Sequence, residues 1–175
     1  MPRTRQISDS HIFEITRRLL SAGGDRAVTF AAVAKKSGLS GPSLVQRYQS
    51  RESMLLQAQL AGWEALEALT EAAIQRAPSS AKGISALLKA IAPDDLALPP
   101  TDLAVLVSYI DDQALRSRAL AWRGRLVAAI AERLGSKDRE GAEIIFAAWQ
   151  GRILWSGAGV EGFRLRDLQK RLAKS

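Results

Sequence analysis

The chain has 175 residues, of which 47% are hydrophobic and 25% charged, and it contains no cysteine. This composition is typical of a globular protein, and it excludes disulfides, thiol nucleophiles and thiolate metal sites. The N-terminus is charged, and no uncharged apolar run approaches the ~20 residues that span a membrane. We therefore expect a cytoplasmic protein with no membrane partner.

The net charge of +7 is concentrated at one end of the chain. Residues 1–51 hold nine basic and three acidic side chains, whereas the other 124 residues hold 16 basic and 15 acidic ones. Such asymmetry indicates a polyanionic partner for the N-terminal part. Charge alone leaves a second interpretation open, that of a well-solvated surface.

Hydrophobic spacing predicts a first helix near the N-terminus. Ile12, Ile15 and Leu19 recur at intervals of three and four residues, which places them on one helical face. The pattern predicts that this helix starts near Ser8 and ends at the glycine pair that begins with Gly23.

A second and a third short helix are expected over residues 30–37 and 41–48. Thr29 and Ser40 are placed to cap their N-termini, and Gly38 supplies the reversal between them. Two short helices joined by a tight turn that contains glycine match the helix-turn-helix motif.

The rest of the chain also has helical spacing, and no sustained two-residue alternation is present. After a break at Gln49, a long helix is expected from Ser50 to about Ala77, with a length of ~40 Å. Further helices are expected at about 81–91, 101–111, 113–134, 138–156 and 165–174. The fold class is therefore predicted to be all-α, with a helix-turn-helix domain over residues 1–50 and a helical domain over 51–175.

Residues 8–56 resemble the TetR-like (TetR/AcrR) family of bacterial transcriptional regulators. That family shows a threonine at the start of its second helix, an apolar-alanine pair, a Gly-Val-Ser turn, a short recognition helix and a Ser/Asn-Lys-Glu start to the fourth helix. The matching positions are Thr29, Val33-Ala34, Gly38-Leu39-Ser40, Ser43-Leu44 and Ser50-Arg51-Glu52. Three positions depart from the pattern: Val45 replaces the usual tyrosine, Arg47 the usual histidine and Tyr48 the usual phenylalanine.

The resemblance implies that the third helix enters the major groove of double-stranded DNA with its N-terminus first. Gln46 is the best candidate for direct readout, because its amide can pair with adenine. The residues expected nearest the base edges are Gly41, Pro42, Ser43 and Gln46, and those expected at phosphates are Thr29, Ser40, Arg47 and Arg51. In the competing interpretation the hydroxyl groups are only helix caps and the arginines are only solvated.

The resemblance also implies a cavity for an effector and a dimer interface in the C-terminal domain. Candidate cavity walls are Trp63, Tyr109, Trp122 and Trp149, with Asp112 and Gln150 as polar anchors. Candidate interface residues on the last two helices are Ala147, Gly151, Ile153, Trp155, Leu168 and Leu172. Packing of these side chains inside one subunit is the competing explanation for both sets.

The predicted function is that of a homodimeric repressor that a small apolar or aromatic effector releases from a palindromic DNA operator. Activation, or regulation without an effector, remains open. The rival hypothesis is a helical protein–protein interaction module with a basic N-terminal face. One histidine and no cysteine give no catalytic or metal-ligating constellation, so neither an enzyme nor a cofactor is expected.

Overall fold

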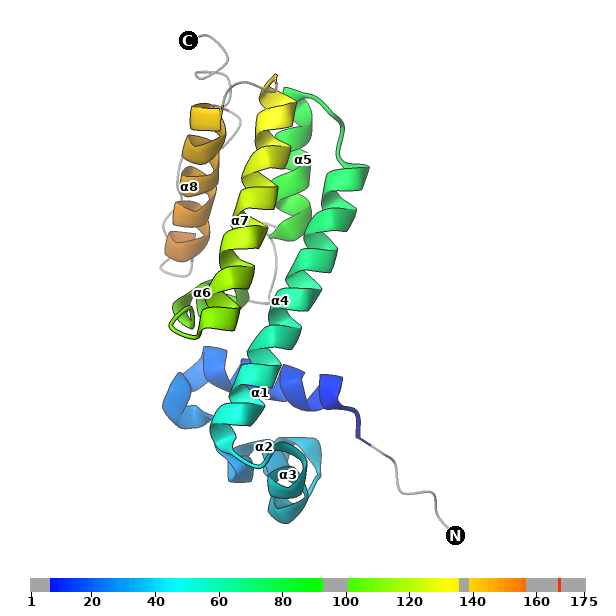
Figure 1. The fold of residues 1–175 in the computed structure, drawn as a ribbon, viewed down its shortest axis with the longest axis vertical. Helices are drawn as coiled ribbons and strands as arrows, with labels where there is room; N and C mark the ends of the chain where they lie inside the picture. The colour runs from blue at the N-terminus through cyan, green and yellow to red at the C-terminus, as the bar shows by residue number, and fades with distance from the viewer. Residues whose placement is uncertain (1–6, 93–100, 136–138, 157–166, 168–175) are drawn as a thin grey trace. The chain divides into compact units, whose positions relative to one another are not determined.

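The computed structural model describes residues 7–92, 101–135, 139–156 and 167, and every regular element within them is helical (Figure 1). The all-α prediction is therefore confirmed. In chain order the elements are α1 (Asp9–Gly23), the short 3-10 helix η1 (Asp25–Ala27), α2 (Phe30–Ser37), α3 (Gly41–Tyr48), α4 (Arg51–Arg76), α5 (Ala81–Ile91), α6 (Thr101–Ser108), α7 (Gln113–Leu134) and α8 (Arg139–Ser156). The helix expected at 165–174 falls outside the described residues, apart from residue 167.

The chain divides into two compact units, residues 1–64 and residues 65–175. Helix α4 contributes its first part to the first unit and its remainder to the second. The predicted division at residue 50 lies just before α4, whereas the compact units divide within that helix.

The first unit is built from an apolar face on each of its helices. Helix α2 packs against both α1 and α3, and η1 packs against α1. The buried apolar residues of this unit are Ile12, Ile15, Leu20, Val28, Val33, Leu44, Tyr48, Met54, Leu55, Ala58 and Trp63. Because α2 and α3 have only eight residues each, this shared core rather than helix propensity stabilises them.

Asp9 connects the start of α1 to the end of α3. The Tyr48 hydroxyl donates a hydrogen bond of 2.5 Å to Asp9 Oδ1, and the tyrosine side chain is buried. Burial, followed by the hydrogen bond to Asp9, raises the pKa of Tyr48 from 10.0 to about 12. This contact fixes the C-terminal end of α3 against α1.

The second unit has its core between α7 and its neighbours α5 and α8. Trp122, Phe146 and Trp149 form an aromatic cluster with ring centroids 6.0 to 6.4 Å apart, and all three are buried. The other buried apolar residues of these three helices are Ile84, Leu87, Leu88, Ile91, Leu115, Leu126, Val127, Ala129, Ile130, Ala142 and Ile145.

Three polar contacts join the second half of α4 to α7, and we call them the α4–α7 polar ladder. They are the ion pair of Glu67 with Arg118 at 3.0 Å, the hydrogen bond from Trp122 Nε1 to Thr70 Oγ1 at 2.8 Å, and the ion pair of Glu71 with Arg125 at 3.1 Å. Residue numbers rise together along both helices, so α4 and α7 run in the same direction (Figure 1).

The buried Arg133 side chain holds the C-terminal end of α4. Its guanidinium group donates to the carbonyl oxygens of Ile74 at 2.7 Å, Ala77 at 3.1 Å and Pro78 at 3.1 Å, and also to Ala129 on its own helix at 2.9 Å. The last carbonyl groups of a helix lack intrahelical partners and carry partial negative charge, so a cation there is stabilising. Arg133 thus satisfies the end of α4 without any carboxylate partner among the described contacts.

We expect Tyr48 to ionise near pH 12 in the folded protein and near pH 10 in the unfolded chain. The folded state favours the neutral phenol, so its stabilising contribution is complete below pH 10 and is lost between pH 10 and 12. The measurement is phenolate absorbance after a rapid pH jump, in a Tyr109→Phe background that leaves one tyrosine. Asp9→Asn should lower the pKa of Tyr48, and an unchanged value would mean that burial alone sets it.

We expect Arg133→Met to lower the free energy of unfolding by about 3 kcal/mol, because several buried carbonyl groups lose their donor. Urea denaturation followed by circular dichroism measures the change. Arg123→Met is the matched control, since Arg123 is an exposed arginine of the same helix that forms an ion pair with Glu143. Equal loss in both variants would show that the buried guanidinium adds nothing beyond an ordinary surface ion pair.

Candidate nucleic-acid interface

Helix α3 has one buried side and one exposed side, as a recognition helix requires. Leu44 and Tyr48 are buried in the first unit. The exposed side chains of the helix are those of Pro42, Ser43, Val45, Gln46 and Arg47, while Gly41 is intermediate. Val45 is the exposed apolar member, with 47% of its surface accessible. The outer surface of α3 therefore offers an amide, a hydroxyl, a cation and a methyl-bearing side chain.

Both helices of the motif begin with the side-chain caps that were predicted. Thr29 Oγ1 accepts from the Ala32 N–H at 3.0 Å, and Ser40 Oγ accepts from the Ser43 N–H at 3.2 Å. The hydroxyl groups of Ser40 and Ser43 also lie within hydrogen-bonding distance, at 2.7 Å. Thr29, Ser40 and Ser43 remain exposed, so capping does not remove them from the surface.

The turn between α2 and α3 depends on Gly38. Its backbone is in the left-handed region, with φ of 78°, and its N–H donates to the Ala34 carbonyl at 2.9 Å. Glycine adopts this conformation without the steric cost that a Cβ atom brings. The tight reversal lets α3 start at Gly41, three residues later.

The guanidinium group of Arg47 is held by the start of α1. It donates to the Ile7 carbonyl at 2.9 Å and lies 3.4 Å from Asp9 Oδ1. Its side chain is 31% exposed, so the cation remains accessible to a phosphate. Asp9 was not among the predicted site residues, although it contacts both Arg47 and Tyr48. The contacts of Asp9 span 38 and 39 residues of the chain, so no local sequence signal indicates them.

Arg51 holds the segment that precedes α2. Its Nε donates to the Val28 carbonyl at 2.6 Å, and its Nη2 donates to the Asp25 carbonyl at 2.5 Å and lies 2.6 Å from Asp25 Oδ2. The hydrogen bond to Asp25 raises the pKa of Arg51 above its usual value. Because Thr29 follows directly after Val28, Arg51 positions the N-terminus of α2. This role was not predicted, and it uses the same guanidinium group that was expected at a phosphate.

A strained turn of two residues, Gln49 and Ser50, joins α3 to α4. Gln49 has φ of 67° and ψ of −49°, and it is the only non-glycine residue with positive φ among the described residues. The Ser50 N–H donates to the Tyr48 carbonyl at 2.7 Å, which closes a γ-turn around Gln49. Ser50 Oγ then accepts from the Ser53 N–H at 3.0 Å and caps α4.

The six residues predicted to line an effector cavity have different surroundings. Trp63 is buried in the first unit, whereas the other five belong to the second. Trp122 and Trp149 pack together in the aromatic cluster. Asp112 caps α7, since its carboxylate accepts from the N–H groups of Ala114 and Leu115. Tyr109 and Gln150 are partly exposed. The structure therefore brings two of the predicted tryptophans together, and it gives Asp112 the role of N-cap of α7.

Four of the six residues predicted at a dimer interface lie on α8 within the described part of the chain. Ala147 and Trp155 are exposed, while Gly151 and Ile153 are partly exposed. Ile144 and Leu154 extend this apolar face, with 42% and 65% of their surfaces accessible. Leu168 and Leu172 lie outside the described residues.

The described residues contain neither a membrane-spanning helix nor a cluster of metal ligands. No described helix is long and apolar enough to cross a membrane. No group of three or more histidine, aspartate or glutamate side chains in the described part of the chain is placed to hold a metal ion.

Comparison with known proteins identifies the N-terminal unit. Residues 12–58 match the family model for bacterial regulatory proteins of the tetR family. No significant match was found among curated proteins. The match to the tetR family covers both helices of the motif and the start of α4, and it disfavours the interpretation as a protein–protein interaction module.

Solved structures share the fold over nearly the whole chain. A TetR-like transcriptional regulator from Rhodococcus sp. RHA1 is 18% identical, with a TM-score of 0.67, over 99% of this chain and 96% of that one. The TetR-family regulator PfmR from Thermus thermophilus is 17% identical, with a TM-score of 0.61, over 93% and 94%. A protein from Saccharomonospora viridis solved in complex with choline is 16% identical, with a TM-score of 0.72, over 95% and 93%.

These comparisons and the geometry of α2 and α3 agree. The buried inner side of α3, its polar outer side and the capped helix starts are the features that a DNA-reading helix-turn-helix needs. Residues 12–58 therefore form a DNA-binding domain that matches the family model for bacterial regulatory proteins of the tetR family, which supports DNA-binding transcriptional regulation as the role of the chain.

Proposed function

We propose that the chain is a homodimeric repressor that binds a palindromic operator and is released from it by a small-molecule effector. The observation that carries the proposal is the exposed polar side of α3, which lies within the residues that match the tetR family. Two such helices related by a two-fold axis would enter successive major grooves about 34–36 Å apart. The operator would then be an inverted repeat.

Within this proposal the exposed residues of α3 and the N-cap residues of α2 and α3 divide between base reading and phosphate binding. Gln46 is exposed and can offer a donor and an acceptor to one adenine. Gly41, Pro42 and Ser43 form the first turn of α3, which approaches the base edges. Thr29, Ser40 and Arg47 would contact phosphates, which fix the register of the protein on DNA without reading sequence. The exposed Lys35 and Lys36 at the end of α2 add positive charge nearby.

The contacts of Arg51 within the protein favour a positioning role for this residue. Its guanidinium group binds the η1 segment, and its side chain is 26% exposed. We propose that it acts mainly by positioning the N-terminus of α2, where Thr29 meets the phosphate. A direct contact of Arg51 with the DNA backbone would use guanidinium N–H groups that its contacts within the protein leave over.

The apolar face of α8 supports the proposed homodimer. Leu154 and Trp155 are largely exposed, and Ala147 and Gly151 lie one to two turns earlier on the helix. Small residues allow close approach of a second helix, and exposed aromatic side chains are common anchors of interfaces. An isologous contact of α8 with its copy would cover this face.

Two related structures support an effector. The Saccharomonospora viridis protein was solved with choline, and the multidrug binding protein EbrR, which is 17% identical with a TM-score of 0.58, was solved with imidazole. An effector can release DNA only if it binds the free and the DNA-bound forms with different affinities.

The test of the proposal is selection of binding fragments from a genomic library with the purified chain, followed by binding measurements over a salt series. A short inverted repeat, with affinity that falls steeply as salt rises, is the expected result. Uniform weak binding to every fragment would overturn the proposal.

Gln46→Ala and Arg47→Gln should have different effects on DNA binding. Gln46→Ala should relax specificity at one base-pair position by about 1–3 kcal/mol, because it removes a base contact. Arg47→Gln should weaken binding to all sequences and reduce the salt slope by about one, because it removes a phosphate contact. Fluorescence anisotropy with the operator and with single-base variants measures both effects.

Arg18→Gln is the matched control for Arg47→Gln, because Arg18 is an exposed arginine that pairs with Glu14 on α1 and belongs to neither α2 nor α3. DNA affinity should then stay near the wild-type value. Identical losses for Gln46→Ala and Arg47→Gln on every sequence would contradict the proposed division of roles.

Ala147→Glu should shift the protein from dimer to monomer at micromolar concentration, because it places a charge in the proposed α8 interface. Ala90→Glu is the matched control, since Ala90 is an exposed alanine on α5. Sedimentation equilibrium measures the mass of each variant. A dimer that persists in Ala147→Glu with unchanged affinity would exclude this face of α8.

A further inference from the structure

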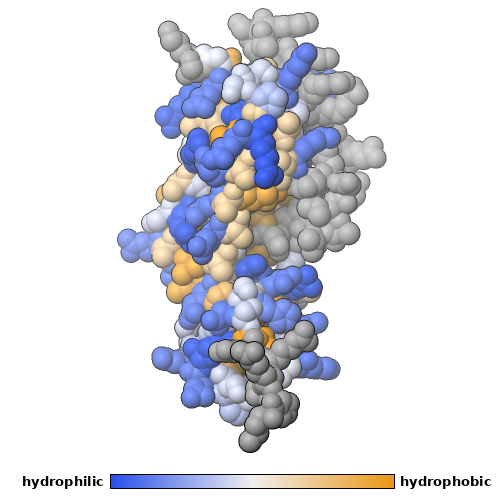
Figure 2. Space-filling model, turned by 90° about the vertical axis from the view of Figure 1, so that its right-hand side faces the viewer, coloured by the Kyte–Doolittle hydropathy of each residue, from blue (hydrophilic) through white to orange (hydrophobic). Residues whose placement is uncertain are grey.

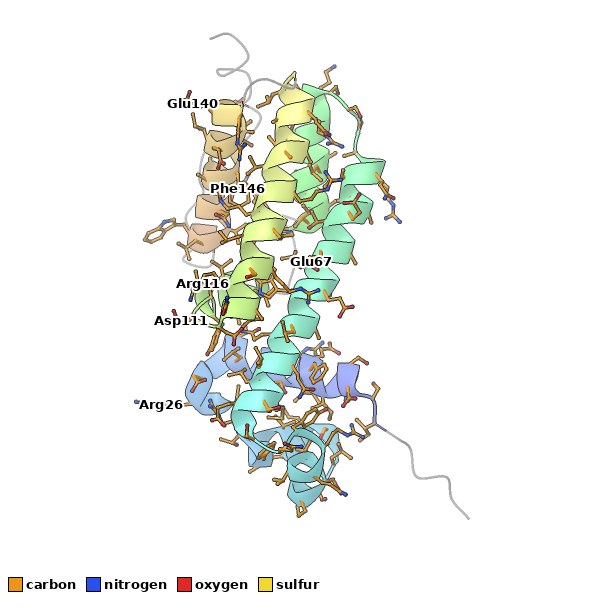
Figure 3. All side chains as sticks on the ribbon, viewed as in Figure 1. Arg26, Glu67, Asp111, Arg116, Glu140 and Phe146 are labelled. Atoms are coloured by element: carbon orange, nitrogen blue, oxygen red, sulfur yellow. The ribbon has the colours of Figure 1, made fainter. Side chains whose placement is uncertain are left out.

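A groove with a volume of about 570 Å³ lies between α4 and α7 in the second unit. Its lining comes from two sides: Glu67, Thr70 and Glu71 on α4, and Ser117, Arg118, Ala121, Trp122 and Arg125 on α7. In Figure 3 Glu67 lies on the side of α4 that faces α7. The volume is in the range of pockets that bind small molecules.

The floor of the groove is apolar and fixed. Trp122 is buried, and its Nε1 donates to Thr70 Oγ1, whose own hydroxyl donates to the Leu66 carbonyl at 2.7 Å. Ala121 adds a methyl group beside the indole. This floor can accept an apolar body but offers no open hydrogen-bonding group on the indole. On the side of the molecule drawn in Figure 2, where α4 faces the viewer, apolar surface alternates with hydrophilic side chains.

The two ion pairs of the α4–α7 polar ladder are the charged groups of the groove. Arg125 binds Glu71 through two parallel hydrogen bonds, from Nε at 3.2 Å and from Nη2 at 3.1 Å. Arg118 binds Glu67 through Nη2 at 3.0 Å. All four side chains are between 34% and 47% exposed. Ion pairs this exposed contribute little net stability, so a competing ligand can replace them at low cost.

We propose that this groove binds a small organic dianion with two carboxylates joined by an apolar spacer. The ligand carboxylates would displace Glu67 and Glu71 from Arg118 and Arg125. The guanidinium group of Arg125 already presents its forked edge to a carboxylate, which is the geometry the ligand would use. Arg118 and Arg125 are seven residues apart on α7, which corresponds to about 10 Å along the helix axis. A linear dicarboxylate with a six-methylene spacer spans most of that separation and places its methylene groups over Ala121 and Trp122.

Binding of this kind would change α4 as well as α7. Glu67 and Glu71 are four residues apart on α4, so their carboxylates face one another once the arginines have been taken. Like charges at this spacing destabilise a helix modestly. The dianion would therefore weaken the side-chain connections between α4 and α7, whereas Arg133 would still hold the C-terminal end of α4. This inference rests on the proposed effector function and names the chemical class of the effector.

The experiment is isothermal titration of the full chain at low ionic strength with suberate, and separately with octanoate and 1,8-diaminooctane. Wild type should bind suberate more tightly than octanoate, and it should not bind the diamine. Arg118→Gln and Arg125→Gln should each weaken suberate about tenfold or more, because each removes a charge-assisted hydrogen bond to the ligand. Glu67→Gln and Glu71→Gln should tighten suberate several-fold, because each removes an internal competitor.

Arg123→Gln is the matched control, since Arg123 lies between the two ligand-binding arginines on α7 but pairs with Glu143 on α8 and does not line the groove. Its suberate affinity should equal that of wild type. Circular dichroism of each variant verifies folding. The proposal is overturned if wild type does not bind suberate, if Arg118→Gln and Arg125→Gln leave suberate affinity unchanged, or if the diamine binds and the effects of the Arg and Glu variants are reversed.

A parallel measurement separates this proposal from the proposed function. Operator binding is followed by fluorescence anisotropy with and without suberate. Loss of suberate affinity in the arginine variants supports the dianion site whether or not DNA is released. If suberate binds in this pattern but leaves operator affinity unchanged, the site stands and the effector role of the dianion is overturned.

Discussion

The guanidinium group of Arg133 is the interaction on which the second unit depends most directly. A buried cation is costly unless its donors are satisfied, and here carbonyl oxygens at the end of α4 and beyond it satisfy them. The same contact removes the need for another cap on a helix of 26 residues. The position of α7 relative to the second half of α4, and with it the spacing across the groove, follows from this one side chain together with the α4–α7 polar ladder.

Charge has two separate uses in this protein. In the first unit, arginines at the ends of α3 and at the start of α4 bind backbone carbonyls and aspartates, and they organise the surface that is proposed to meet DNA. In the second unit, arginines on α7 connect helices through glutamates. Guanidinium groups suit both uses because they keep their charge at any physiological pH and offer several donors in fixed directions.

Local signals predicted the first unit well. Thr29, Ser40 and Gly38 act where propensity and capping rules placed them, because each effect involves residues at most four positions apart. Capping and propensity rules could not predict the roles of Asp9, Arg51 and Arg133. Their partners lie 23 to 59 residues away in the chain, and no local pattern indicates that pairing. Asp112, which was predicted as a polar anchor for a ligand, also has a local role as the N-cap of α7.

The γ-turn at Gln49 has a consequence for how this regulator can search DNA. Only two residues, the strained Gln49 and the capping Ser50, separate α3 from α4, so the chain has no flexible linker at that point. A linker would let each recognition helix reorient independently at a cost in entropy, whereas this junction makes α3 follow the start of α4 as one body. Any rotation of the start of α4 would therefore reorient α3 by the same angle.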